Sequence, residues 1–413
     1  MTIGRNRPAA RPRILVVEDG DGLWGAQRYL LRLAPLLEAR GFEQVLAAPG
    51  ESAVARAWRA QGGRHVDLPV VADRRVRRQG DHGPFSPLLV LRELARTAAN
   101  ARRVARLASA MGTDVLHANG HWTHLEVALG AQLAGRPVVL HLHELTLPGV
   151  AGRLRAAAVR TADASVAVSN AVAGCLPERA RSRVVVIHNG VDPVALSPGP
   201  ADPAVRRELA TDPSAPLVLA MCRLVPGKGV DQIIRAVAGL GGELGRTQLA
   251  VVGGSPDRGL AEHLRALGTE LLGARIRFLG PRQDITAVLR SVDVLVQASS
   301  REGLPLAVLE AQACGTPVVA YPAGGTSEII RDGETGLLAR QGDVAHLGVC
   351  IGEVLADADL RANLARKGRI QVADGFTLDQ QADRLVRMLD ELVTGGGSGA
   401  RSPRPVTRHR FGP

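Results

Sequence analysis

A pair of glutamates at a predicted helix is the feature of this sequence whose chemistry is easiest to name. Glu302 lies in a loop that reads SSREGLP, and Glu310 follows eight residues later beside apolar Val308, Leu309 and Ala311. Carboxylates in such apolar company are rarely mere surface charge, and their oxygens accept hydrogen bonds from sugar hydroxyls. The pair predicts a site for two sugars of one ligand, with two glutamates on a helix surface as the alternative.

Two cations flank a turn after another predicted strand. Arg223 and Lys228 enclose the residues LVPG and stand just before a helix, where backbone N–H groups also attract anions. Only two of the 51 basic residues are lysines, which favours a specific role for Lys228. The pattern predicts a clamp for a diphosphate, with two solvated loop cations as the alternative.

A glycine-rich loop follows the first predicted strand. Gly20, Gly22 and Gly25 form a G-x-G-x-x-G sequence before a helix, which is typical of a dinucleotide-binding turn. The second strand ends in AAPG, without the carboxylate that would bind the ribose of a dinucleotide. A nicotinamide-dependent oxidoreductase is therefore disfavoured. We expect Gly22 and Gly25 to form either a phosphate-binding loop or simply a tight turn.

Histidines mark the end of the strand predicted over 137–142. His141 and His143 alternate onto one face of this strand, and His143 lies near its end, at the edge where parallel sheets bind ligands. His143 is therefore a candidate for the reacting centre, with a core histidine as the alternative. His117 ends another predicted strand and is a weaker candidate of the same kind.

Alternating strands and helices must position these motifs. Continuous apolar strands alternate with helical patterns, which is typical of parallel sheets covered on both faces. This alternation of strands and helices starts again after the Pro-rich segment 194–204. We predict an α/β protein with two Rossmann-like, doubly wound parallel-sheet domains that face a central cleft. Their bounds are 1–196 and 197–394, and a low-complexity, disordered tail follows over 395–413.

Composition narrows the class of protein further. The chain has 413 residues, of which 46% are hydrophobic and 2% aromatic. The hydrophobic fraction suffices for two cores. The low aromatic fraction disfavours binding of nucleic acid by base stacking. No apolar run approaches the ~18 residues of a membrane span, and the apolar run near the N-terminus is too short for a signal peptide, so we expect a cytoplasmic protein. The four cysteines are far apart, so we expect neither a disulfide nor a zinc site.

Positive charge is concentrated in the first half. Residues 1–196 hold 26 arginines against 16 acidic residues, whereas residues 197–394 hold 21 basic and 24 acidic residues. Many arginines lie in segment 73–78 and in a helix predicted over 86–111. An apolar stripe on this helix is expected to face the core; it comprises Leu91, Leu94, Ala95, Ala98, Ala101, Ala105 and Ala108. The arginines would then meet an anionic surface, either lipid headgroups or a lipid-linked phosphate acceptor, unless the face is merely solvated.

Together these motifs resemble the retaining, family 4 glycosyltransferases, which have the two-Rossmann GT-B fold. The resemblance runs from about Arg13 to about Leu392. Its specific part is the E-x7-E element from Glu302 to Glu310, and the order and spacing of other segments support it. These segments are WGAQRYLLRLAPLLEARGFE (24–43), HNGVD (188–192), RLVPGKGV (223–230) and GGTSEII (324–330).

The resemblance implies a nucleotide-sugar donor and a retaining transfer without a metal or other cofactor. Arg223 and Lys228 would hold the donor diphosphate and stabilise it as it leaves. Glu302 would bind the sugar hydroxyls, and Glu310 would bind the nucleotide ribose. An acceptor hydroxyl would attack from the face that the nucleotide leaves and lose its proton to the departing phosphate, since no protein nucleophile is evident.

The resemblance also implies roles around this donor site. Backbone amides at Gly303 and Leu304 would line the sugar–phosphate site. His143 corresponds to the histidine at the catalytic edge of the first domain, and the loop with Gly22 and Gly25 would close over phosphate and acceptor.

Two departures from the family pattern bear on the acceptor side and the interdomain turn. WGAQ (24–27) replaces the frequent Gly-Gly-Ala-Glu, and His188 replaces a proline. A nucleotide-sugar epimerase of the same two-domain shape is the nearest rival function, and a basic nucleic-acid-binding protein is a more distant one.

Overall fold

The computed structural model describes residues 11–20, 22–69, 87–120, 123–146 and 149–395. They form two compact units. The first comprises the chain up to Ile187, apart from Ser169–Ala171, and returns from Ala382 onward; the second comprises Ser169–Ala171 and His188–Gln381. The predicted tail beyond Gly395 and the arginine-rich segment 73–78 lie outside the described residues.

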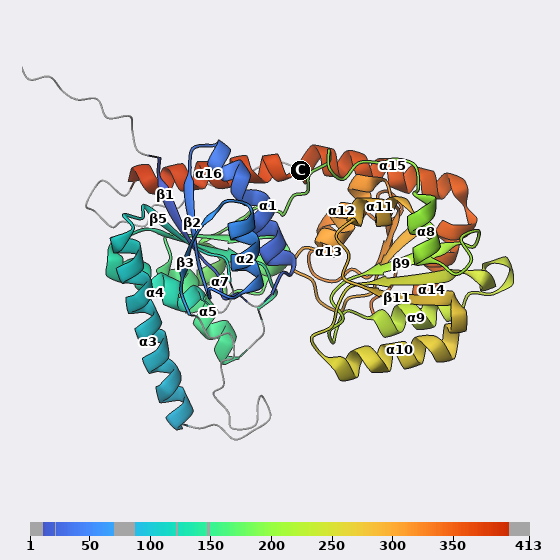
Figure 1. The fold of residues 1–413 in the computed structure, drawn as a ribbon, viewed down its shortest axis with the longest axis horizontal. Helices are drawn as coiled ribbons and strands as arrows, with labels where there is room; N and C mark the ends of the chain where they lie inside the picture. The colour runs from blue at the N-terminus through green and yellow to red at the C-terminus, as the bar shows by residue number, and fades with distance from the viewer. Residues whose placement is uncertain (1–10, 21, 70–86, 121–122, 147–148, 396–413) are drawn as a thin grey trace, which may run out of the picture. The chain divides into compact units, whose positions relative to one another are not determined.

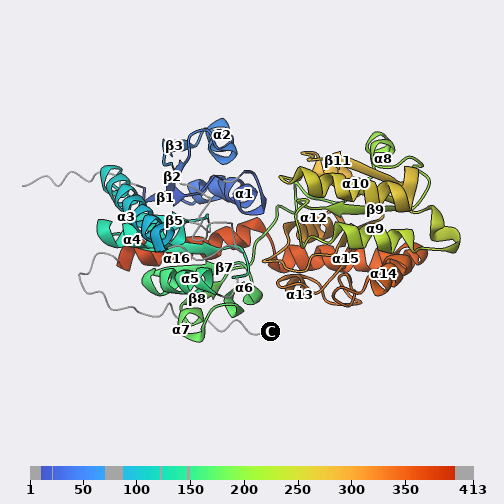
Figure 2. The same ribbon diagram turned by 90° about the horizontal axis from the view of Figure 1, so that it is seen from below.

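A parallel sheet of seven strands forms the first unit (Figure 1), in the order β3-β2-β1-β5-β6-β7-β8. The strands are β1 (Arg13–Val17), β2 (Glu43–Ala48), β3 (Arg64–Asp67), β5 (Val115–Ala118), β6 (Val138–Leu142), β7 (Ala164–Ala167) and β8 (Val184–Val186). One face carries α1 (Gly25–Ala39) and α16 (Leu378–Gly395), and the other carries α3 (Pro87–Ala110), α4 (His124–Ala134) and α5 (Val150–Thr161), as Figures 1 and 2 show. Shorter helices are α2 (Ala53–Ala60), α6 (Asn170–Gly174) and α7 (Glu178–Arg181).

A second parallel sheet, of six strands, forms the second unit in the order β11-β10-β9-β12-β13-β14. The strands are β9 (Leu217–Met221), β10 (Gln248–Val252), β11 (Ile276–Gly280), β12 (Val294–Gln297), β13 (Val318–Ala320) and β14 (Leu337–Leu338). Helices α9 (Val230–Ala238), α10 (Arg258–Leu272) and α14 (Val344–Ala356) cover one face, and α11 (Ile285–Arg290), α12 (Leu306–Cys314) and α15 (Ala358–Gly375) cover the other (Figure 1). Shorter helices are α8 (Pro203–Leu209), α13 (Thr326–Ile329), η1 (Gly242–Arg246) and η2 (Gly273–Arg275).

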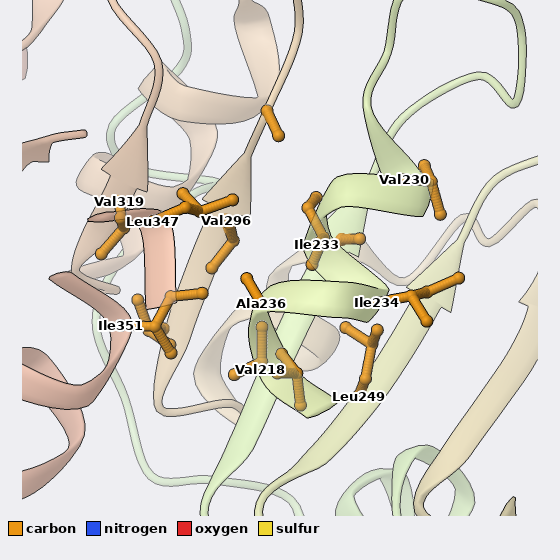
Figure 3. Packing of buried hydrophobic residues seen from close by; sticks show 14 of the residues in the cluster. Val218, Val230, Ile233, Ile234, Ala236, Leu249, Val296, Val319, Leu347 and Ile351 are labelled. Carbon is orange, nitrogen blue, oxygen red and sulfur yellow. The ribbon is translucent and has the colours of Figure 1, made fainter. Parts of the chain in front are cut away.

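The core of the second unit shows why these strands read as continuous apolar runs. Strand side chains from β9, β10, β12 and β13 pack against α9 and α14, and all of them are buried (Figure 3). The labelled residues are Val218, Val230, Ile233, Ile234, Ala236, Leu249, Val296, Val319, Leu347 and Ile351. Burial on both sheet faces removes the need for alternating polar residues. The predicted α/β class with two Rossmann-like parallel sheets is confirmed.

The two compact units differ from the predicted halves, 1–196 and 197–394, at two places. The chain passes into the second unit at His188, before the Pro-rich segment, because the turn after β8 pairs with residues of that unit. Val191 N–H donates to Phe376 O at 2.9 Å, and Leu378 N–H donates to Val191 O at 2.9 Å. From Ala382 onward the chain belongs to the first unit, where Asp383 of α16 pairs with Arg40 at 2.7 Å.

The apolar stripe predicted along α3 faces the core only in its second half. Ala101 and Ala108 are buried, but Leu91 and Leu94 remain 64% and 59% exposed. The prediction is wrong for the N-terminal half because α3 runs on past α4, the helix it packs against (Figure 1). Helical periodicity marks a face of the helix, but it does not show where along the helix a neighbour ends.

Candidate functional site

Glu302 and Lys228 meet in loops that follow two neighbouring strands, β12 and β9. Lys228 Nζ donates to Glu302 Oε1 at 2.6 Å, and Gln297 Nε2 at the end of β12 donates to the same oxygen at 2.7 Å. The Lys228 and Glu302 side chains keep only 24% and 10% of their exposure. The structure thus brings together one predicted cation and one predicted carboxylate in partly desolvated surroundings.

Backbone contacts fasten these two loops to each other. Ser300 N–H donates to Gly227 O at 2.8 Å. Gly229 has a φ of +68°, and any side chain there would overlap the carbonyl of Ala298, so this close approach requires glycine. Arg223 is half-buried in the same loop, two residues after β9 ends. Arg223 and Lys228 are therefore carried by one short loop whose course is fixed by the loop after β12.

Glu310 is held inside α12, on the element that follows Glu302. Pro305 is the N-cap residue of this helix, and Gly315 ends it with a left-handed φ of +73°, as the sequence predicts. Glu310 is buried, so its carboxylate is not a plain surface charge. The helix geometry places Glu302 before the first turn and Glu310 inside the helix, which separates the two carboxylates along one element.

A second glycine turn lies directly on the Glu302 loop. Gly325 N–H donates to the carbonyl of Glu302 at 3.2 Å, and a side chain at Gly325 would overlap the carbonyl of Gly303. Leu304, next in the chain, is buried. The segment 323–326, which follows β13, therefore fixes the backbone of the predicted sugar–phosphate residues Gly303 and Leu304.

Sequence reasoning did not identify Glu328 as the centre of a polar cluster. Its carboxylate accepts hydrogen bonds from the backbone N–H groups of Asn170 and Ala171, from Asn170 Nδ2 and from His188 Nε2, at 2.8–2.9 Å. Burial alone would raise the pKa of Glu328, but these donors outweigh it and lower that pKa to about 2. The signal in the sequence is His188, which stands where the family pattern has a proline.

In the first unit, three side chains from adjacent strand ends form a hydrogen-bonded chain. His143 Nε2 lies 2.9 Å from Asn119 Oδ1, and Asn119 Nδ2 lies 2.5 Å from Glu18 Oε2. Glu18 and Asn119 are buried, whereas His143 is half-buried at the end of β6. Sequence reasoning identified His143 but missed Glu18 and Asn119, because only the strand order β1-β5-β6 brings their strand ends together.

The other strand-end histidines are core residues. The His141 and His143 rings stack with centroids 4.3 Å apart, so the two side chains share a face as the alternation predicts. His141 and His117 are buried, and His117 Nε2 lies 3.3 Å from His141 Nδ1. Burial lowers the pKa of His117 to about 4, and burial followed by the neighbouring histidines lowers that of His141. Both are therefore neutral at physiological pH.

The glycine-rich loop forms a tight turn at the start of α1. Gly22 has a φ of +98°, a side chain there would collide with the Trp24 indole, and its N–H donates to Gly20 O at 2.8 Å. Gly25 is the first residue of α1, and a side chain there would meet open space. Gly22 is therefore required by backbone geometry, whereas Gly25 leaves room beside the helix start.

The edge of the second sheet carries side chains that suit an anionic, hydroxyl-bearing ligand. The second sheet presents Arg223, Lys228, Glu302 and Glu310, which together can hold phosphate oxygens and hydroxyls. Throughout the part of the chain that the structure describes, no cluster of three or more His, Cys, Asp or Glu side chains has a metal-binding arrangement.

The known proteins that this chain resembles are glycosyltransferases. The family model "Glycosyltransferase Family 4" matches residues 24–194, and "Glycosyl transferases group 1" matches residues 202–371. The D-inositol 3-phosphate glycosyltransferase 1 of Catenulispora acidiphila is 32% identical over 68% of this chain and 73% of its own length. The lipopolysaccharide core biosynthesis glycosyltransferase LpsE of Rhizobium meliloti is 36% identical over 45% of this chain, which spans 52% of that relative.

Solved structures share the whole fold. Anabaena HepE in complex with UDP and glucose has a TM-score of 0.77 at 22% identity, covering 92% of this chain and all of that one. Sucrose-phosphate synthase from Thermosynechococcus elongatus has a TM-score of 0.74 at 20% identity, covering 93% of this chain and all of that one. These likenesses support the predicted GT-B fold. By its two family models and by its Catenulispora relative, the chain belongs to the group 1, family 4 glycosyltransferases.

Proposed function

We propose that this protein is a retaining glycosyltransferase that moves a sugar from a UDP- or GDP-linked donor to an acceptor hydroxyl in the synthesis of a glycan, polysaccharide or glycolipid. The observation that carries the proposal is the Lys228–Glu302 pair at the edge of the second sheet, with buried Glu310 on the helix that follows. A cation beside one carboxylate and a second carboxylate a helical turn or two away match the phosphate, sugar and ribose of one nucleotide-sugar.

In this proposal the protein supplies charge where the donor bond breaks. Arg223 and Lys228 neutralise the diphosphate as it leaves, which is usually the largest contribution to such a reaction. Glu302 orients the sugar through its hydroxyls, and Glu310 holds the ribose. The acceptor oxygen forms the new bond to the anomeric carbon on the face that the diphosphate leaves, and its proton passes to a phosphate oxygen. Retention of configuration follows from that geometry.

The donor and the stereochemistry can be tested together. A thermal-shift panel of UDP, GDP and ADP sugars should show stabilisation by one nucleotide class, because a ligand that binds only the folded state raises Tm. Proton NMR of the product formed first should then show the same anomeric configuration as the donor. An inverted product would contradict retention, and the absence of stabilisation by any of these nucleotide sugars would contradict the donor site.

Metal independence is a further part of the proposal. If arginine and lysine take the place of a divalent cation, transfer should persist in excess EDTA at an unchanged rate. A rate that falls with EDTA and returns with Mg²⁺ or Mn²⁺ would show that the cations alone do not suffice.

Epimerisation of a nucleotide-sugar is the rival reaction on the same fold. The names of the curated relatives above describe transferases, which favours transfer. Their acceptors also suggest a first panel: inositol phosphates and lipopolysaccharide core sugars. Donor consumption that requires an acceptor supports transfer, whereas conversion of the donor sugar without any acceptor would favour the epimerase.

We also propose that the protein acts in the cytoplasm at an anionic membrane surface, where a lipid-linked acceptor would lie. Among the described residues no helix is long and apolar enough to cross a bilayer. The N-terminal part of α3, however, exposes Leu88, Leu91 and Leu94, with exposed Arg92 beside them and three further exposed arginines along the helix: Arg102, Arg103 and Arg106. Leucines that insert at the headgroup level and arginines that pair with anionic lipids are the two parts of an interfacial helix.

Sedimentation with vesicles tests this surface. We expect binding to vesicles with anionic lipid at low salt and release at high salt, because each arginine near such a surface contributes about 1 kcal/mol. Changing Leu88, Leu91 and Leu94 together to serine should abolish binding, whereas Val349→Ser, on an exposed position of α14, should not. Equal binding to anionic and neutral vesicles, or no binding at low salt, would contradict the proposed membrane surface. The acceptor would then be a soluble molecule.

A further inference from the structure

A buried carboxyl group lies behind His143 and is not used by the proposed transfer. Glu18 follows β1 with no exposed surface. Its Oε1 accepts from Gln27 Nε2 and from the backbone N–H of Asp19, each at 3.0 Å, and its Oε2 accepts from Asn119 Nδ2 at 2.5 Å. A carboxyl group is costly to bury, so three N–H donors aimed at its two oxygens mark a built arrangement.

The donors around Glu18 determine which way the Asn119 amide points. An ionised carboxylate only accepts hydrogen bonds, so the NH₂ end of Asn119 must face it. The same NH₂ group lies 3.5 Å from the carbonyl of Ala26, which is also only an acceptor. The amide oxygen of Asn119 is then left to face His143 Nε2 at 2.9 Å. Because that oxygen cannot donate, Nε2 of His143 must carry the hydrogen, and Nδ1 becomes the nitrogen that gains or loses a proton.

The opposite arrangement follows when Glu18 holds a proton. When this proton lies on Oε2 and points at Asn119 rather than at the adjacent Asp19 side chain, the amide turns its oxygen toward Glu18 and its NH₂ group toward His143. Nε2 of His143 must then accept, and the ring hydrogen moves to Nδ1. Each state of the carboxyl group is therefore compatible with one orientation of Asn119 and one neutral tautomer of His143.

We propose that Glu18 and Asn119 are positioning residues that select the tautomer of His143, with the ionised carboxylate selecting Nε2–H and the protonated carboxyl group selecting Nδ1–H. This inference rests on the proposed function insofar as His143 serves the transfer, but the tautomer is a property of the protein alone. Glu18, which has no exposure to solvent, would thus control the protonation pattern of a histidine at the ligand-binding edge of the sheet.

Burial and the charges near Glu18 favour a change of the His143 tautomer near physiological pH. Burial, and then the adjacent Asp19, raise the pKa of Glu18 well above its usual range. The other titratable groups packed here are Tyr29, whose ring meets both His141 and His143 edge-on, and the buried histidines: His117, His124 and His141. The pKa values of His117 and His141 are lowered, so these two remain neutral through the range in which Glu18 titrates.

Nitrogen-15 NMR of the histidine rings tests the selection directly, with His143 assigned through His143→Gln. At pH 9.5 the wild-type protein should show His143 as the Nε2–H tautomer. Glu18→Gln is expected to place its amide oxygen toward the two donors of Gln27 and Asp19 and its NH₂ group toward Asn119, as a protonated carboxyl group would. That variant should show the Nδ1–H tautomer at every pH at which His143 is neutral.

The control is Ser165→Ala, an equally buried position on neighbouring β7, which should leave the wild-type tautomer. In transfer assays Glu18→Gln should lower kcat by up to about tenfold, the scale of the one hydrogen bond that His143 would no longer offer, with the donor KM within about twofold of wild type. A purely structural role would not move the ring hydrogen.

The outcomes separate the two proposals. Wild-type protein without any transfer activity would overturn the proposed function, while the NMR result would still decide the tautomer. An Nδ1–H ring in the wild-type protein at pH 9.5, or an Nε2–H ring in Glu18→Gln, would overturn the inference. If Glu18→Gln does not fold, the wild-type spectrum at pH 9.5 remains decisive, because an Nδ1–H ring there overturns the inference.

Discussion

The Lys228–Glu302 pair makes the sharpest quantitative test of the donor site. At 2.6 Å the attraction between two unit charges is about 6 kcal/mol in the dielectric typical of a protein surface. Desolvation offsets most of this, because the two side chains keep only 24% and 10% of their exposure. Exposed pairs contribute about 0–1 kcal/mol, and breaking a buried pair costs about 3–5 kcal/mol. We expect this intermediate pair to show a coupling energy of about 1–3 kcal/mol.

A double-mutant cycle measures that coupling in the free energy of unfolding. Lys228→Met removes the charge and keeps the aliphatic stem. Glu302→Gln keeps an oxygen for the donors of Lys228 and Gln297, because both bonds in the wild-type protein reach the same oxygen, Oε1. The single variants and the double variant should be compared by urea unfolding, with Lys367→Met, the chain's other lysine, as the control.

The same variants separate the two roles in ligand binding. Lys228→Met should weaken binding of the nucleoside diphosphate by about 2 kcal/mol, roughly thirtyfold, since it removes a charged hydrogen-bond donor. Glu302→Gln should leave that affinity nearly unchanged and remove most transfer, because its carboxylate is assigned to the sugar. A coupling energy near zero, or equal loss of diphosphate affinity in Lys228→Met and Lys367→Met, would refute the reasoning.

Four further predictions concern single carboxylates and one arginine. Arg223→Ala should lower kcat/KM by about 2–4 kcal/mol in transfer assays, and wild-type turnover would reject its place in the clamp. Glu310→Gln should weaken nucleotide binding by about tenfold in calorimetry, unlike Glu302→Gln, because its carboxylate is assigned to the ribose. Glu328→Gln should destabilise the protein by about 1–2 kcal/mol at pH 7; since the folded pKa is lowered to about 2, this difference should shrink as the pH falls from about 4.5 towards 2 in thermal unfolding. Glu18→Gln should have the opposite pH dependence: a raised folded pKa means that the folded state binds more protons, so wild-type stability falls as the pH rises above about 4.5 and the variant should flatten that decline.

How far the sequence predicts the site depends on how local the signal is. Arg223 and Lys228 share one loop, and Glu302 and Glu310 share one loop and helix, so spacing alone identified each pair. The meeting of Lys228 with Glu302 also follows once both loops are placed after neighbouring strands. Glu328 escaped prediction because its partners lie about 140 and 158 residues away in the chain.

The extent of α3 and the unit boundary were missed for a different physical reason. The periodicity of Leu91 and Leu94 is that of a buried stripe, yet their exposure depends on where α4 ends, which no local pattern encodes. Likewise the Pro-rich composition of 194–204 marks a linker, whereas the boundary falls at His188, because hydrogen bonds between Val191 and the chain at Phe376 and Leu378 attach the turn to the second unit.

Strand order explains why a carboxylate and its hydrogen-bond donor meet at these two places. In the first sheet the chain runs outward from β1 through β2 and β3, and then resumes on the other side of β1 with β5. The second sheet does the same from β9 through β10 and β11 before resuming at β12. At such a switch point the loops after the two central strands turn to opposite faces and leave space between them. Glu18 and Asn119 follow β1 and β5, and the Lys228 and Glu302 loops follow β9 and β12, so each unit places a carboxylate and its hydrogen-bond donor across its own switch point.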